Sequence, residues 1–147
     1  MKKLTIERQF DVVPEKIFEG FTNPEEMRVW WTEDTVFNID LQVGGSYSII
    51  REEDGITYTM TGEYIEIERP NKIKYTCGMP DFSSIMDTIS IEIHSNGKGG
   101  SKMIFTQEGE GINAELKELP EGEISESEKG WQLGFDLMEQ SWNNRKK

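Results

Sequence analysis

Cysteine and histidine are almost absent from this chain of 147 residues. Cys77 is the only cysteine and His94 the only histidine. A single thiol cannot form an internal disulfide, which indicates a reducing, cytoplasmic setting. One imidazole and one thiol also cannot supply a cluster with the ligand spacing of a zinc site. We therefore expect no metal ion and no cofactor, and we interpret Cys77 as a small buried hydrophobic residue.

Basic residues and long apolar runs are scarce as well. Sixteen lysines and arginines stand against 28 aspartates and glutamates, so the formal net charge is −12 at pH 7. Nucleic-acid binding depends largely on cationic side chains that neutralise phosphates, so this balance argues against such a partner. Charged residues interrupt the apolar ones from Met1 to Arg8. The sequence therefore predicts no nucleic-acid partner, no membrane insertion and no signal peptide.

Recognisable catalytic motifs are missing too. His94 falls on the polar side of a strand pattern rich in isoleucine, so we interpret it as solvent-facing. No serine lies in a Gly-x-Ser-x-Gly turn. The segment 96–100, Asn-Gly-Lys-Gly-Gly, lacks both the ending of a phosphate-binding loop and a following helix. The runs Glu52-Glu53-Asp54 and Glu121 to Glu128 lie in predicted loops or near a predicted helix start, where charged side chains are normally solvated. We assign no catalytic residue.

What is present is a regular succession of short elements. Alternation of apolar and polar residues over 4–10 predicts a strand. Pro14 and the apolar residues after it predict a helix over about 14–21. Asn23 followed by Pro24 predicts a second short helix, which carries Met27, Trp30 and Trp31. From residue 35 to residue 107, turn signals separate short alternating runs, a pattern that indicates an antiparallel meander.

The last third of the chain supplies a cover for this sheet. The acidic segment 108–124 is punctuated by glycine and proline, so we interpret it as a loop with at most a helical turn. After it, apolar residues recur at helical spacing and predict a long terminal helix: Trp131, Phe135, Met138 and Trp142. No internal repeat or boundary divides the chain, so we expect one domain over residues 1–147.

Several local motifs carry a resemblance to a known family. They occur in one order along nearly the whole chain: Pro14-Glu15-Lys16-Ile17-Phe18, Asn23-Pro24-Glu25 before Trp30-Trp31, Asp40 to Tyr47, Gly62 to Ile67 with Pro70, and Gly130-Trp131. They resemble the activator-of-heat-shock-protein-ATPase homologues, which have the START-like, or helix-grip, fold. The family commonly has an arginine where this chain has Gln42, so no charged role is carried over to that position.

The resemblance implies an α+β fold: a curved antiparallel sheet of about seven strands, two short helices after the first strand, and a long C-terminal helix packed on the sheet. A helix gripped by such a sheet brings many aromatic and methionine side chains together. They could fill a solid core or line a ligand cavity, and the resemblance favours the cavity. The predicted ligand-binding residues are Trp30, Trp31, Tyr47, Tyr58, Met60, Tyr75, Met79, Phe82, Trp131, Phe135 and Met138.

Three functions remain open from the sequence. The first is non-enzymatic binding of a small hydrophobic molecule, such as a lipid, a polyketide or an aromatic natural product, as the resemblance implies. The second is a cyclase or dehydratase of the kind found elsewhere in the superfamily, which requires a carboxylate or tyrosine with a shifted pKa inside the cavity. The third, taken from the family's name, is a module that contacts a chaperone ATPase. Both a monomer and a homodimer are compatible with the sequence.

Overall fold

The computed structural model describes residues 1–32 and 34–145, which form one sheet of seven antiparallel strands. In space the order is β1-β7-β6-β5-β4-β3-β2, so the first strand pairs with the last and every other pair is consecutive in sequence. This confirms the predicted antiparallel meander. The strands are β1 (Leu4–Phe10), β2 (Val36–Ile39), β3 (Ser46–Glu53), β4 (Ile56–Glu68), β5 (Lys72–Cys77), β6 (Asp87–Ser95) and β7 (Ser101–Glu108).

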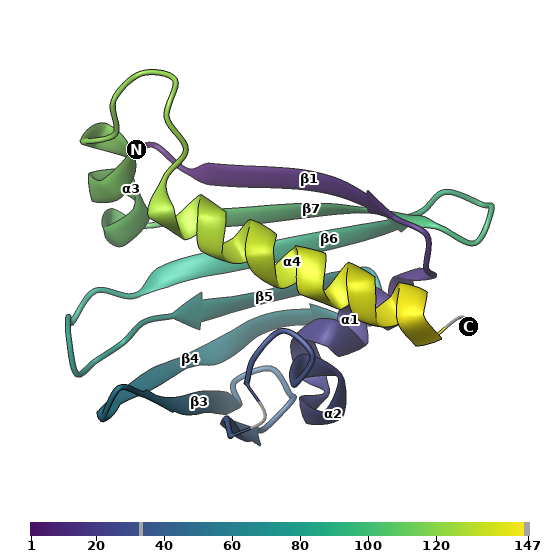
Figure 1. The fold of residues 1–147 in the computed structure, drawn as a ribbon, viewed down its shortest axis with the longest axis horizontal. Helices are drawn as coiled ribbons and strands as arrows, with labels where there is room; N and C mark the ends of the chain where they lie inside the picture. The colour runs from purple at the N-terminus through teal and green to yellow at the C-terminus, as the bar shows by residue number, and fades with distance from the viewer. Residues whose placement is uncertain (33, 146–147) are drawn as a thin grey trace.

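Helices cover one face of this sheet. The long helix α4 (Glu126–Arg145) crosses it diagonally, while α1 (Pro14–Thr22) and α2 (Pro24–Met27) lie below the C-terminal end of α4 (Figure 1). A further helix, α3 (Glu110–Lys117), lies at the opposite end of the molecule. The predicted α+β, helix-grip architecture is therefore confirmed, with two short helices after the first strand and a long C-terminal helix on the sheet.

The helix α3 corrects the prediction of a loop over 108–124. Its N-cap residue, Gly109, offers no side chain to accept hydrogen bonds from the first turn. The carboxylate of Asp87 does so from β6, because it accepts from the backbone amides of Gly111 at 3.0 Å and Ile112 at 2.9 Å. Ile112 is buried on the inner side of the helix. A cap and an anchor that are distant in sequence therefore stabilise a helix that local propensity does not predict.

A second correction concerns α2, which ends at Met27 and does not carry Trp30 and Trp31. Both tryptophans lie in the turn that follows, where their amides donate to the carbonyl of Met27. The indole Nε1 of Trp30 donates to the carbonyl of Gly20 at 2.8 Å. Its six-membered ring also lies so close to Gly134 of α4 that a Cβ there would overlap it. Packing against α1 and α4 therefore sets the path of this segment.

Arg8 fixes α4 on the first strand. Its guanidinium donates to Asp136 at 2.8 Å and to Glu139 at 3.3 Å, both on α4, and to the side chain of Gln132 at 3.0 Å. It also lies 5.3 Å from the ring centroid of Phe10. Because Arg8 is mostly shielded from solvent, with 17% of its side chain exposed, these contacts are screened less than an exposed ion pair. They hold the helix against the sheet edge.

Gly62 allows β4 and β5 to approach closely beside this core, and its replacement by alanine is expected to lower the free energy of unfolding by about 1–3 kcal/mol. A Cβ at this position would overlap the carbonyl oxygen of Thr76 and lie 2.9 Å from the ring of Tyr47. Urea denaturation measures the effect. Gly130 of α4 has open space around its Cα, so Gly130→Ala should instead stabilise the protein by about 0.5–1 kcal/mol. Equal effects of the two substitutions would contradict this packing.

Candidate functional site

An apolar cavity lies beneath α4, between the strands β3 to β5 and the turn after α2. One wall comes from the sheet, through Tyr47 and Ile49 of β3 and their neighbours, and the other comes from the helices and the tryptophan turn. The lining residues are Phe21, Met27, Trp30, Trp31, Tyr47, Ile49, Met60, Tyr64, Tyr75 and Trp131. Strand alternation explains the sheet wall, because residues two apart point to the same face.

The cavity is narrow. The space open to the centre of a water-sized sphere is about 20 Å³, and by the same measure a single water molecule needs about 10–15 Å³. An occupant larger than water must therefore displace lining side chains. Met27 and Met60 are suited to this, because unbranched methionine side chains adopt many rotamers at low cost.

Six of the predicted ligand-binding residues meet at this cavity: Trp30, Trp31, Tyr47, Met60, Tyr75 and Trp131. They come from three strands, α4 and the turn after α2, and their rings form a tryptophan cluster and a tyrosine cluster on opposite walls. The ring centroids of Trp30 and Trp31 lie 5.4 Å apart, and those of Tyr47 and Tyr75 also lie 5.4 Å apart.

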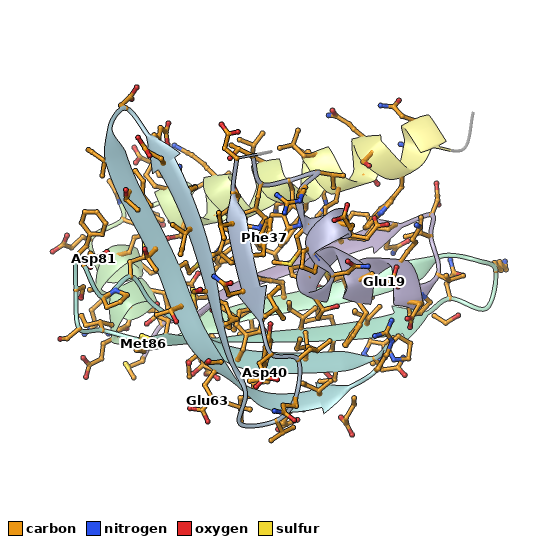
Figure 2. All side chains as sticks on the ribbon, turned by 90° about the horizontal axis from the view of Figure 1, so that it is seen from below. Glu19, Phe37, Asp40, Glu63, Asp81 and Met86 are labelled. Carbon is orange, nitrogen blue, oxygen red and sulfur yellow. The ribbon has the colours of Figure 1, made fainter. Side chains whose placement is uncertain are left out.

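The other five predicted residues do not line the cavity. Phe135 and Met138 are fully buried on α4 and fill the core beside it. Phe82 is 60% exposed and stacks on Tyr58, with 5.6 Å between the ring centroids. Met79 begins the same loop between β5 and β6. Figure 2 shows this loop, through its labelled residues Asp81 and Met86, at the end of the molecule opposite Glu19 of α1.

Four lining residues were not predicted: Phe21, Met27, Ile49 and Tyr64. Ile49 shares the inward face of β3 with Tyr47, so strand alternation was a sufficient signal for it. Tyr64 faces Tyr75 across the β4–β5 pair, next to a β-bulge between Tyr64 and Glu66. Its parity along β4 matches that of Met60, so strand alternation is a signal for it as well, whereas the bulge that follows leaves Ile65 41% exposed.

Three of the six indole and hydroxyl groups of the cavity wall have described hydrogen-bond partners. The indole Nε1 of Trp131 donates to Oε1 of Gln107 at 2.9 Å, and the hydroxyl of Tyr47 donates to the carbonyl of Thr76 at 2.7 Å. Trp30 donates to Gly20, as described above. The indole Nε1 of Trp31 is different, because it is buried and has no hydrogen-bond partner among the described residues.

The ionisable groups near the cavity are held protonated. Burial raises the pKa of Tyr47 and of Tyr75 well above the ordinary value, and raises the pKa of Tyr64 to about 12. Burial also raises the pKa of the Cys77 thiol to about 11. At neutral pH these phenols are therefore hydrogen-bond donors and not bases, and the thiol is not a nucleophilic thiolate. The described lining residues include no carboxylate, lysine, arginine or histidine.

These raised pKa values predict a loss of stability in alkali. The unfolded chain ionises Tyr64 and Cys77 near 10.0 and 9.0, whereas the folded protein retains both protons up to about 12 and 11. Between these limits the unfolded state binds fewer protons, so the free energy of unfolding falls as the pH rises. We expect the urea midpoint to decrease from about pH 9 to pH 12, and Tyr64→Phe to make this decrease shallower. An identical slope in both proteins would contradict burial of the phenol.

Within the described ranges 1–32 and 34–145, no group of three or more His, Cys, Asp or Glu side chains is arranged to hold a metal ion. The same ranges contain no helix that combines the length and the apolar character needed to cross a membrane.

The curved sheet, the long C-terminal helix and the apolar cavity between them define a protein of the START-like, helix-grip class. The sequence model of one family of this class, described as activator of Hsp90 ATPase homolog 1-like protein, matches residues 11–142. The chain belongs to this family. A comparison with curated proteins finds no match.

Solved structures share the fold at low sequence identity. A Chromobacterium violaceum protein has a TM-score of 0.74 and 21% identity, over 94% of each chain. A Staphylococcus aureus protein of unknown function has a TM-score of 0.71 and 23% identity, over 93% of this chain and 91% of that one. An HSP90 activator from Plasmodium falciparum has a TM-score of 0.63 and 24% identity, over 74% of each chain. Identities this low establish the fold alone.

Proposed function

We propose that this protein binds a small, largely apolar molecule in the cavity beneath α4 without transforming it. The observation that carries the proposal is the lining itself: ten apolar or aromatic side chains converge from every layer of the fold. Ligand sites are typically apolar, with few placed polar groups. The narrowness of the cavity means that binding proceeds with displacement of side chains such as Met60, so affinity is reduced by the cost of opening.

Calorimetric titration against a panel of lipids and aromatic natural products tests this proposal. A binder should show a negative heat-capacity change, the marker of apolar burial. Met60→Trp places a larger ring in the cavity and should abolish binding, whereas Met86→Trp makes the same substitution at a residue that is 42% exposed and should leave binding unchanged. Failure of every compound to bind, or equal binding by both variants, would reject the proposal.

Contact with a chaperone ATPase is a second candidate, which the family description and the Plasmodium falciparum HSP90 activator support. The formal net charge of −12 would favour a basic surface on such a partner. Adding the purified protein to an Hsp90 ATPase assay tests this candidate. A stimulated rate that falls with increasing salt would support it, and an unchanged rate would eliminate it.

A cyclase or dehydratase function is less well supported than binding. Proton transfer requires a group whose pKa lies near the working pH. The cavity tyrosines have a pKa well above that range, and the described lining residues include no carboxylate.

The raised pKa of Cys77 also fits the reducing cytoplasmic setting inferred for this protein, since burial keeps its thiol protonated and slow to oxidise.

A further inference from the structure

Every indole and phenol of the cavity wall can donate a hydrogen bond, and only the phenols can also accept one, which limits the chemistry of the ligand. The indoles of Trp30, Trp31 and Trp131 can only donate, and the buried tyrosines are present as phenols. Two of the three indoles already donate hydrogen bonds: Trp30 to the carbonyl of Gly20, and Trp131 to the side chain of Gln107. Trp31 is the remaining one, and its Nε1 is screened from solvent with no described partner.

An unpaired buried donor is costly, and the cost disappears when an acceptor reaches it. The folded protein thus has a buried indole N–H without a described hydrogen-bond acceptor on Trp31, which lines the apolar cavity. Since the described lining residues carry no charge, the wall offers no counter-charge to a carboxylate or to an amine. The aromatic faces could attract a cation, but the positive end of an indole N–H repels one.

We propose that the ligand is a neutral aromatic or aliphatic molecule with a carbonyl or similar acceptor oxygen, which accepts a hydrogen bond from Nε1 of Trp31. This inference rests on the proposed function, because it places that oxygen in the same cavity. It makes Trp31 the residue that selects among apolar ligands of equal size, while the other lining side chains supply contact area.

Four single-ring probes of similar size test the selection. They are ethylbenzene, which has no acceptor, acetophenone, which has a carbonyl, benzoate, which is anionic, and trimethylanilinium, which is cationic. In nitrogen-resolved NMR titrations each tryptophan contributes its own indole N–H signal. Acetophenone should bind about 2- to 10-fold more tightly than ethylbenzene, the ratio that corresponds to one net hydrogen bond. It should also shift the Trp31 indole signal downfield, and ethylbenzene should not.

Two matched variants separate this effect from packing. Trp31→Phe removes the N–H and retains a ring, so the preference for acetophenone should vanish while ethylbenzene still binds. Trp142→Phe removes the other buried indole N–H that lacks a described partner, but Trp142 packs on Phe10 and does not line the cavity. The preference should survive this second substitution. Trp142→Phe therefore controls for the loss of a buried indole elsewhere in the core.

The outcomes distinguish the inference from the proposed function. Equal affinity for acetophenone and ethylbenzene, tighter binding of either charged probe, or an unchanged preference in Trp31→Phe would overturn the inference while leaving cavity binding in place. If none of the four probes perturbed any indole signal of the cavity, the proposed binding itself would be overturned together with the inference.

Discussion

Replacement of Phe135 by alanine is expected to lower the free energy of unfolding by about 3–5 kcal/mol, the range found for buried phenylalanines. The side chain is fully buried at the middle of α4. Its ring centroid lies 5.4 Å from that of Phe105 on β7 and 6.0 Å from that of Phe21 on α1. The substitution would remove the side chain that joins the long helix to both the sheet and α1, and the rigid neighbours could fill the void only in part.

The measurement is urea denaturation followed by circular dichroism, with Phe82→Ala as the matched control. Phe82 is 60% exposed in the loop between β5 and β6, so its replacement should change the stability by no more than about 0.5 kcal/mol. A domain of this size is typically stable by about 5–15 kcal/mol, so Phe135→Ala should leave a marginal fold. A cost near that of Phe82→Ala would mean that α4 is not anchored at this point.

The elements around Phe135 show which parts of the fold the sequence predicts. The helical spacing of Trp131, Phe135 and Met138 predicts α4, because a period near 3.6 specifies both the helix and its buried face. The same period cannot separate core from cavity. Trp131 lines the cavity, whereas Phe135 and Met138 lie on the same helix face and fill the core. That distinction depends on what the sheet and α1 place opposite each residue.

Strand alternation along β4 likewise cannot distinguish a residue that lines the cavity from one that does not. Tyr58 and Met60 share a face, and only Met60 reaches the cavity. Tyr58 lies closer to the β3–β4 hairpin, where it stacks on Phe82 and where Arg51 lies 4.6 Å from its ring centroid. Alternation therefore assigns the face of a residue but not its distance from the covering helix. The position of Phe82 depends on the conformation of a loop, about which periodicity says nothing.

The cavity wall is connected to α3 through a chain of polar contacts. Trp131 donates to Gln107 of β7, whose amide nitrogen donates to Asp87 at 2.9 Å. Asp87 in turn accepts the two amides that begin α3. One buried carboxylate of β6 thus serves both the orientation of a cavity tryptophan and the start of a helix. Since Asp87 lies far from both partners in sequence, no local motif predicts this arrangement.

Asp87→Ala should therefore cost about 3–5 kcal/mol of unfolding free energy, comparable to the loss of a core phenylalanine. Asp87 is 7% exposed, and its carboxylate accepts three hydrogen bonds. Each hydrogen bond to a charged acceptor contributes about 1.5–3 kcal/mol, and the sum is less than additive. Asp87→Asn retains one acceptor oxygen and should fall between the wild type and alanine. Urea denaturation measures all three proteins.

Hydrogen exchange identifies the cause of this loss. In Asp87→Ala the amides of Gly111 and Ile112 should exchange much faster, because α3 loses its cap. Exchange of amides in the centre of the sheet should change only as much as the free energy of global unfolding changes. Asp81→Ala removes an exposed carboxylate from the neighbouring loop and should alter neither stability nor these amides. Retained protection of Gly111 and Ile112 in Asp87→Ala would show that α3 forms without Asp87. The hydrogen bonds from Asp87 to these amides would then not couple the cavity wall to α3.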